Sequence, residues 1–269
     1  MLARVGYPLL ITYAVGITWL LGQGLDTMSL ALLAGVVSGS CTTIVAIWEW
    51  FAPAYEDWAS ADDETVSDLA LTLGVLPVLV VVGEWTWRLL LPALDTPWPT
   101  HWPSLVQMVL GLLMCELSYY CFHVGCHTTD PLWRLHVVHH ASKRVWWGNS
   151  GRFHPIDAQI GFLLYFLPLV IMGVPAFVCA LIVVLNASTG LLEHANVEIR
   201  VGPLNRIFNT AELHRHHHTY TEGGELRNLG KVLSVWDTVF GTYHYAVEPP
   251  KRIGAEGEMA WPFRVTRGG

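Results

Sequence analysis

Charged side chains are scarce in this sequence: Asp, Glu, Lys and Arg make up 14% of the 269 residues, whereas a soluble domain carries roughly a quarter. Apolar residues make up 52% of the chain and lie in long blocks. This composition excludes a disordered chain and argues against an ordinary soluble domain. The formal net charge of −7 gives no dominant basic surface, so we expect no nucleic-acid partner.

Cysteine is also scarce, and the spacing of the five residues predicts no disulfide framework. They are Cys41, Cys115, Cys121, Cys126 and Cys179. Most lie in apolar segments, so we predict reduced thiols that pack as small apolar groups. Cys121 and Cys126 lie among histidines, but packing is the favoured interpretation for both.

Long apolar runs predict membrane-spanning helices, each of which needs about 20 mostly apolar residues. Four such runs cover residues 5–25, 27–48, 69–91 and 104–122. A further uncharged run, 158–192, is too long for one span and has prolines in its middle, which predicts a helical hairpin. The acidic stretch 55–68 is expected to be a solvated loop. The first run lacks a small-residue cleavage site, so we expect a retained span rather than a signal peptide.

The distribution of Lys and Arg sets the expected orientation. They concentrate in the polar segments 123–157 and 193–269, which we therefore expect on the cytoplasmic side. The predicted fold is an all-α integral membrane protein with about four transmembrane helices plus a helical hairpin. A histidine-rich helical cap and both termini would be cytoplasmic. We expect a single membrane domain, 1–269, divided into N-terminal spans with an interfacial loop (1–103), a histidine-box catalytic region (104–244) and a tail (245–269).

Histidine is what the chain has in excess, with 13 residues against 15 Lys and Arg. Three groups have helical spacing, which places their rings on one helix face. They are His123/His127, His136/His139/His140 and His214/His217/His218. Such imidazoles suit iron or zinc, and one ion takes about four to six ligands. The number of rings therefore predicts two metal ions at the membrane surface.

The other histidines differ in their expected roles. His154 and His194 stand next to the polar ends of apolar runs and are further candidate ligands. His101 is expected at the opposite membrane surface. His216 points away from its neighbours if the segment is helical, and His244 follows the last group, so neither is expected to bind metal.

These motifs resemble the fatty acid hydroxylase superfamily, which includes sterol desaturases and sterol methyl oxidases. The resemblance covers about residues 118–243. It rests on the three spaced groups and on Arg152-Phe153-His154-Pro155, Glu193-His194-Ala195-Asn196, Asn228-Leu229-Gly230 and Trp236-Asp237-Thr238-Val239-Phe240-Gly241-Thr242-Tyr243.

The resemblance implies a dimetal centre, normally treated as diiron. The implied ligands are His123, His127, His136, His139, His140, His194, His214, His217 and His218, with His154 as a tenth. Some fatty acid hydroxylases add a histidine four residues before the position of His194, where this chain has Gly190. His154 is the candidate for that role. Without it, one metal would be open to water or oxygen.

Acidic and amide side chains near these histidines are candidates to accept the other ring N–H of a ligand. They are Asp157, Glu193, Asn196 and Asp237. Asp237 is better suited to anchoring the closing segment. An all-imidazole site also leaves the metal charge uncompensated, unlike carboxylate-rich diiron bundles, which favours ferrous iron at rest.

The expected function is O2-dependent hydroxylation of an unactivated C–H bond in a membrane lipid such as a fatty acyl chain, sterol or carotenoid. Desaturation on the same centre is the main alternative, and the sequence does not separate the two. A membrane zinc hydrolase is less favoured because no general base is evident. A metal-binding or transport protein is also less favoured, because transporters place ligands near the bilayer midplane. Zinc competes for imidazole, so a purified sample can hold zinc in place of iron.

The expected partners are the lipid and an electron donor. The sequence has no nucleotide-binding fingerprint, so we expect electrons from a separate ferredoxin or a small b-type cytochrome with its reductase. Lys143, Arg144 and Arg152 are a candidate docking face for an acidic donor, or equally a phospholipid contact.

Overall fold

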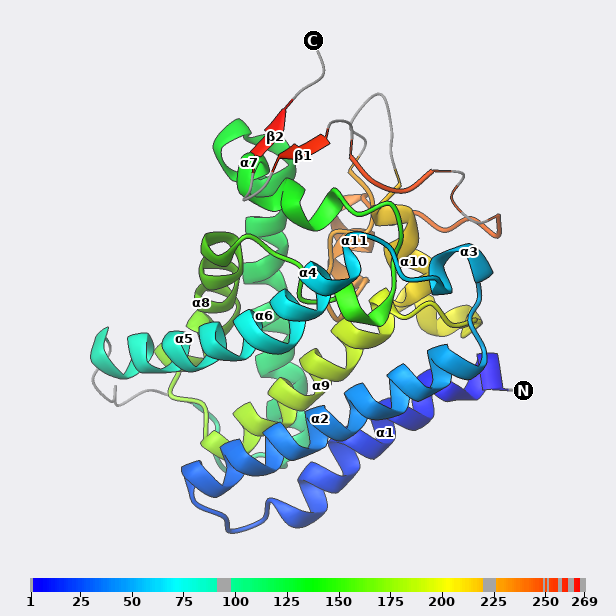
Figure 1. Cartoon of the computed structure of the whole chain (residues 1–269). Helices are drawn as coiled ribbons and strands as arrows, with labels where there is room; N and C mark the ends of the chain where they lie inside the picture. Colours follow the sequence, from blue (N-terminus) through cyan, green and yellow to red (C-terminus); the bar gives the residue numbers. More distant parts are fainter. Residues whose placement is uncertain are drawn as a thin grey trace.

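The computed structural model describes residues 2–90, 98–219, 226–248, 250, 252–255, 258–260 and 264–266. These form helices and one short antiparallel pair of strands near the C-terminus (Figure 1). The helices are α1 (Leu2–Leu21), α2 (Thr27–Phe51), α3 (Glu56–Ala59), α4 (Thr65–Leu69), α5 (Leu76–Leu90), α6 (Ser104–Thr128), α7 (Asp130–His140), α8 (Pro155–Ile171), α9 (Ala176–His194), α10 (Ala211–His217) and α11 (Val235–Phe240). The strands are β1 (Glu258–Ala260) and β2 (Arg264–Thr266). The expected interfacial loop and the tail lie partly outside the described residues.

Among the described residues, five helices are long and apolar enough to cross a membrane: α1, α2, α6, α9 and the helix over 65–83, which runs from α4 into α5. A π-helical stretch, Ala70–Val75, joins α4 to α5. The apolar helix α8 is shorter, with 17 residues. It forms the predicted hairpin with α9 through a turn in which Gly173 has a φ of 59°. The predicted all-α membrane fold, with four spans and a hairpin, is confirmed.

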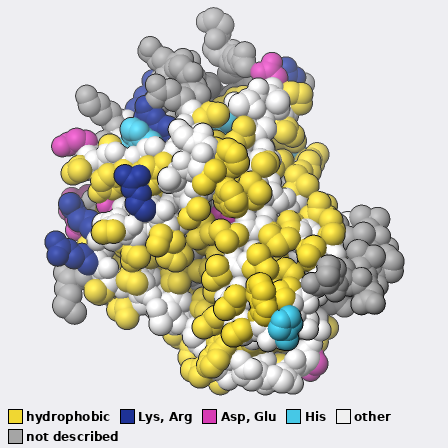
Figure 2. Space-filling model, turned by 180° about the vertical axis from the view of Figure 1, so that it is seen from behind, with side chains coloured by type: hydrophobic (Ala, Val, Ile, Leu, Met, Phe, Trp, Pro, Cys, Tyr) yellow, Lys and Arg dark blue, Asp and Glu magenta, His cyan; other side chains and the backbone are white. Residues whose placement is uncertain are grey.

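Helix α9 is the most enclosed of the candidate spans and packs against α1, α2, α6 and α10 (Figure 1). One apolar cluster joins it to α1 and α2 through residues such as Val37 and Leu192. A second joins it to α6 and α8 through residues such as Leu112 and Ile182. The outer face of α2 stays apolar, with Val36 71% exposed, as expected for contact with lipid. Figure 2 shows hydrophobic side chains over most of the rear face.

Several helix ends meet at one end of the molecule. The Arg200 N–H donates to the Ala3 carbonyl at 2.7 Å, and the Ala54 N–H donates to the Asn196 carbonyl at 2.8 Å. The start of α1, the end of α2 and the segment after α9 therefore lie together. The predicted HxxxH pair lies on the last turns of α6, which continues to Thr128. Pro131 lies in the first turn of α7, where its missing N–H has no helical partner to lose.

The acidic stretch 55–68 is largely solvated, as its composition predicts, because most of its residues are exposed. It is not a loop throughout: it contains α3 and the start of the third span, and the side chain of Asp68 is fully buried. Asp68 accepts from the guanidinium of buried Arg152 at 2.6 Å, and Glu64 pairs with the same group at 3.0 Å. A buried arginine without a partner would be strongly destabilising, so these contacts hold the C-terminal end of the stretch against the segment that follows α7.

Candidate metal centre

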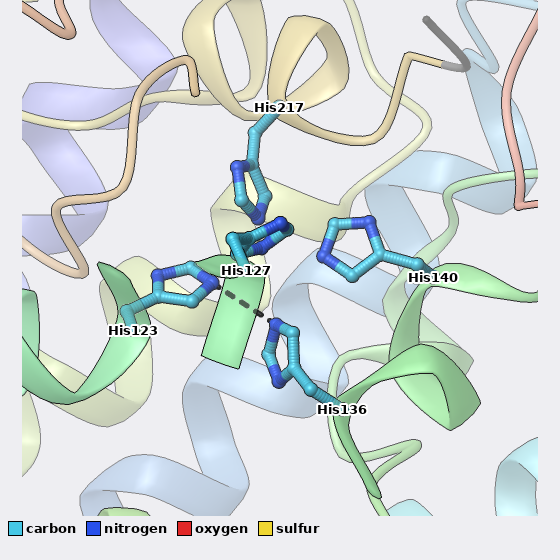
Figure 3. A group of neighbouring side chains, drawn as sticks. All are labelled: His123, His127, His136, His140 and His217. Atoms are coloured by element: carbon cyan, nitrogen blue, oxygen red, sulfur yellow. Dashed lines mark hydrogen bonds between the residues drawn. The ribbon is translucent and has the colours of Figure 1, made fainter. Parts of the chain in front are cut away.

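Nine of the ten candidate ligands come together in two groups among the described residues. The five-histidine group contains His123, His127, His136, His140 and His217 (Figure 3). The four-histidine group contains His139, His194, His214 and His218. Within each group the offered ring nitrogens all lie within 4.8 Å of one another. The groups adjoin, because the His140 and His218 ring centroids are 4.5 Å apart.

Two segments, 136–140 and 214–218, each carry histidines at their first, fourth and fifth positions (HxxHH), and the histidines of each segment are divided between the two groups. In α7, His136 and His140 join the five-histidine group and His139 joins the other. In α10 and its C-cap the division is reversed, because the pair four residues apart joins the four-histidine group and His217 crosses over. Side chains four residues apart share a helix face, whereas the one at the third position is rotated from it. Each of these two helical segments thus contributes ligands to both groups.

The outward ring nitrogens of five histidines have fixed acceptors, as metal-ligating histidines usually do. In the five-histidine group, His123 Nδ1 donates to the Leu229 carbonyl at 2.7 Å, and His217 Nδ1 donates to that of Arg227 at 2.8 Å. His136 Nδ1 donates to Asp157 Oδ2 at 3.0 Å. These contacts leave Nε2 of all three rings facing the interior of the group.

The four-histidine group is held in the same way. His194 Nδ1 donates to Asn149 Oδ1 at 2.9 Å, and His139 Nδ1 donates to the Arg152 carbonyl at 3.3 Å. The Asn149 amide is itself oriented, because its Nδ2 donates to the Arg144 carbonyl at 2.8 Å. The inward Nε2 atoms are then free to act as ligands.

The inward nitrogens fit a bound cation. His123 Nε2 lies 3.0 Å from His136 Nε2, yet both rings already donate through Nδ1, so in the neutral tautomers two lone pairs face each other (Figure 3). The Nε2 atoms of His127, His140 and His217 are buried without a hydrogen-bond partner. Buried polar atoms are normally paired. A bound metal ion would give all five nitrogens a partner, and a set of imidazoles without carboxylates suits a transition metal.

Five grouped histidines outside the candidate spans are held in the neutral form. Burial, together with neighbouring imidazoles, lowers the pKa of each of these five rings, and for His217 the pKa falls to about 3. The others, with pKa values well below the usual range, are His139, His140, His214 and His218. Neutral imidazole is the form that binds metal, so the groups are prepared for ligation at physiological pH.

The four predicted acidic and amide neighbours divide in two. Asp157 accepts from His136, and Glu193 Oε2 lies 3.9 Å from His214 Nδ1. Asn196 instead pairs with the backbone of Tyr55: its Oδ1 accepts the Tyr55 N–H at 3.0 Å, and its Nδ2 donates to the Tyr55 carbonyl at 2.8 Å. Asp237 accepts the N–H groups of Leu229 and Gly230, so it anchors the closing segment, as its sequence position favours.

The structure does not bring His154 into either group. It is the N-cap of α8, and its Nδ1 accepts the Ile156 N–H at 3.2 Å. His216 faces the other way, towards the Ala246 carbonyl and the ring of His244. His101 is exposed beside Trp102. None of these four belongs to either histidine group among the described residues. The five cysteines are free; Cys126 Sγ lies 3.8 Å from Asp157.

Three residues support the site in ways that the sequence analysis did not predict. Two received no role there, and the third, Arg152, was assigned to a docking face. Asn149 orients His194, and no local pattern indicates this role. Arg152 holds His139 through its carbonyl and Val138 through its side chain. Glu116, fully buried in α6, accepts three N–H groups from residues 231–233. A carboxylate within a predicted span is itself a functional signal, so Glu116 was open to prediction.

A docking face was predicted from Lys143, Arg144 and Arg152, and this prediction is wrong for the two arginines. Both are buried, with 6% and 1% of their surfaces exposed. Arg144 pairs with Asp62 at 2.9 Å, and Arg152 pairs with Asp68 and Glu64. Their charges are neutralised within the protein and are not offered to a partner.

The helical membrane fold and the two histidine groups define an integral membrane protein with a histidine-rich candidate metal centre. Comparison of the sequence with known protein families identifies the family. The fatty acid hydroxylase family matches residues 108–242, a segment that contains all nine clustered histidines. The chain belongs to this family.

Several characterised proteins are similar to this chain. The ornithine lipid hydroxylase OlsE of Rhizobium tropici is 36% identical over 240 residues, which cover 85% of this chain and 72% of that protein. The alkylglycerol monooxygenase of Homo sapiens is 29% identical over 55% of this chain and 32% of its own length. The Delta(7)-sterol 5(6)-desaturase of Leptosphaeria maculans is 27% identical over 54% and 39%. The chain thus spans about a third of the human relative. No solved structure matches it.

Proposed function

We propose that this protein is an O2-dependent diiron oxygenase that hydroxylates an unactivated C–H bond of a membrane lipid. The observation that carries the proposal is the inward arrangement of Nε2 atoms, above all the 3.0 Å approach of His123 and His136. Two adjoining groups of neutral imidazoles suit two metal ions, and iron is the expected metal. Bound iron would supply the reduction of O2 that hydroxylation of a C–H bond needs.

The chain's own residues would hold and orient this centre. The nine clustered histidines are the proposed ligands. Asp157 would increase the electron donation of His136 by accepting its Nδ1–H. Glu193 would do the same for His214, directly after a small rotation or through a water. The surrounding helices exclude bulk water from both groups, because eight of the nine rings are buried and only His127 is half-buried.

The names of the relatives favour hydroxylation. A lipid hydroxylase and several monooxygenases are among them. Desaturation stays a second candidate, since a sterol desaturase and a lathosterol oxidase also match. A lipid substrate would reach the centre from the bilayer, because the candidate ligands lie at the ends of spans.

We propose that the histidine end of the molecule and both termini face the cytoplasm, in line with the clustering of Lys and Arg in residues 123–157 and 193–269. The proposed catalytic region, 104–244, is supported by the family match over 108–242. Residues 1–103 would add the first spans and 245–269 the tail, within one membrane domain. A separate ferredoxin or small b-type cytochrome would deliver electrons on a surface other than Arg144 and Arg152, which are paired internally.

Anaerobic loading with ferrous iron, followed by O2, an electron donor and a lipid panel, tests this function. The panel contains an amino-acid lipid, an alkylglycerol, a sterol and a phospholipid, each analysed by mass spectrometry. We expect an O2-dependent product that has gained one oxygen atom, which carries the heavy isotope when 18O2 is supplied, or that has lost two hydrogen atoms in the case of desaturation. The double variant H139A/H217A is the matched negative control. Two bound irons and a working donor without any such product would exclude an oxygenase.

A further inference from the structure

A cleft of about 560 Å³ lies on the side of α10 that faces away from both histidine groups. Pockets of this size hold small ligands or parts of larger ones. The start of α1, the end of α2, the segment 198–200, α10 and residues 245–248 form its walls. In Figure 1 the N-terminus and α10 lie on this side of the molecule. The cleft is separate from the candidate metal centre, since none of its lining residues is a clustered histidine.

Helix α10 stands between this cleft and the candidate metal ligands. One face of the helix carries the clustered histidines of α10. The other face lines the cleft, with Glu212, Arg215 and His216. This division follows from the helical repeat of 3.6 residues, and it explains why His216 turns away from its neighbours. His216 Nε2 lies 3.3 Å from the Ala246 carbonyl, so it holds the wall formed by residues 245–248 against α10.

The cleft opens at the expected membrane surface. Leu2 and Trp48 line it at the ends of the candidate spans α1 and α2. Trp50 and Phe51 follow Trp48 and are 83% and 80% exposed. Exposed aromatic side chains at the end of a span are typical of the membrane–water interface. A lipid whose acyl chains lie along α1 and α2 would therefore place its headgroup at the cleft.

A buried cation lines the cleft. Arg215 is 6% exposed, and its guanidinium donates to two backbone carbonyls of the segment after α9 at 2.8 and 2.7 Å. It also contacts the Tyr55 side chain, with Cζ 5.2 Å from the ring centre. Glu49 and Glu212 attract it from a distance, but no carboxylate of the described residues forms an ion pair with it. Buried arginines are rarely left without a charged partner, so Arg215 suits an acidic group of a ligand.

Carboxylates line the same cleft. Glu212 Oε2 accepts two N–H groups at 3.0 and 2.8 Å, whereas its Oε1 accepts the Tyr245 hydroxyl at 3.3 Å. Glu248 is exposed at the rim. Glu198 and Arg200, also at the rim, pair with each other at 2.6 Å and add no net charge. The carboxylates of Glu212 and Glu248, next to the Tyr245 ring, suit an ammonium group.

We propose that this cleft binds the headgroup of a zwitterionic lipid, which carries both an acidic group and an ammonium. The acidic group pairs with Arg215, the ammonium lies near Glu212 and Glu248, and the acyl chains follow α1 and α2 into the bilayer. Because α10 separates the cleft from the histidines, this lipid is not placed for reaction at the metal centre. It supports α10 from the side opposite the candidate ligands. The inference does not depend on the proposed diiron chemistry.

Native mass spectrometry of the full chain in detergent tests the site by counting bound lipids. The probes are phosphatidylethanolamine, which is zwitterionic, and phosphatidylglycerol with the same acyl chains, which lacks the ammonium. We expect one phosphatidylethanolamine per chain, bound at least about tenfold more tightly than phosphatidylglycerol. E248K should abolish this preference, because a lysine repels the ammonium and attracts the acidic group. E56K is the matched control, since Glu56 is exposed on α3 and does not line the cleft.

Equal affinities of the wild type for the two lipids, or an unchanged preference in E248K, would overturn the inference. Soluble phosphoethanolamine is a further probe, and binding as tight as that of the lipid would overturn the assignment to a lipid. R215Q tests the acidic contact, and we expect it to weaken binding of both lipids. Its unfolding temperature without lipid checks the fold, because Arg215 also holds two carbonyls. Undiminished lipid affinity in folded R215Q would contradict the contact. All these results leave the proposed oxygenase function untouched.

Discussion

His139 and His140 are adjacent in the sequence, but their side chains belong to different histidine groups, with ring centroids 5.4 Å apart. His217 and His218 are divided in the same way, with centroids 5.5 Å apart. Each adjacent pair therefore lies between the two candidate metal positions. A change in the orientation of α7 or α10 would alter both positions together, which couples their geometries.

Removal of His139 and removal of His140 should have different effects on metal content. H139A leaves three histidines in the four-histidine group, so we expect iron to fall from two per chain to one. H140A leaves four in the other group, and we expect two irons to remain. Elemental analysis of loaded protein provides the measurement, with exposed His101→Ala as the control. Two irons per chain in H139A would contradict the assignment of ligands.

Asp157 should raise the metal affinity of the five-histidine group through His136. D157N keeps an acceptor but removes the negative charge that faces His136 Nδ1. Neighbours of this kind typically change metal affinity by roughly 10- to 100-fold, and we expect a loss in that range. A competition titration with a metal chelator measures it, with exposed Asp63→Asn as the control. Equal affinities for D157N and wild type would show that the charge is irrelevant.

The buried ion pair between Asp68 and Arg152 should matter more for stability than the pair between Asp62 and Arg144, in which only the arginine is buried. D68A would leave Arg152 buried and short of one partner, which typically costs about 3–5 kcal/mol. Asp62 is 46% exposed, and Arg144 would keep its other hydrogen-bond acceptors, so D62A should cost less, about 1 kcal/mol. Denaturant unfolding of metal-free protein in detergent compares them. Similar losses for both variants would argue against a buried pair.

Acid should destabilise the metal-free protein. The pKa of His217 is lowered to about 3 in the fold, whereas an unfolded histidine has a pKa of about 6.5. Between these values the unfolded chain binds the extra proton, so stability falls as the pH drops below about 6.5. Each histidine that stays neutral adds a slope of about 1.4 kcal/mol per pH unit.

Unfolding free energies between pH 7 and pH 5 measure this effect, and H217N should show a shallower slope because its side chain does not titrate. Metal binding should weaken over the same range, since protons compete for the ring nitrogens. A pH-independent unfolding free energy would mean that the rings are not neutral in the fold.

Local periodicity explains why so much of the architecture could be predicted. A span is defined by its own apolar residues, and histidines four residues apart share a face wherever they are helical. The helices α1, α2, α6 and the α8–α9 hairpin follow from such patterns. The same reasoning made His194 a candidate ligand, because it stands at the end of an apolar run.

Long-range pairing explains what could not be predicted. The burial of Asp68 at the end of the acidic stretch could not be predicted, because its partner Arg152 lies 84 residues further along the chain. His154 looked like a ligand because it stands among the motifs, but it caps α8. Nor does spacing alone tell which ring of an HxxHH segment joins which group. That depends on how α7 and α10 are placed against each other.

The dependence of both groups on α10 has a consequence for biogenesis. The five-histidine group needs His217, and the four-histidine group needs His214 and His218. These residues leave the ribosome only after the last span, α9, has been synthesised. Neither group can therefore be complete while earlier helices are entering the membrane. Any metal that these groups bind would then have to be delivered after insertion, and the cell would have to keep an inserted, metal-free form of the chain competent until that point.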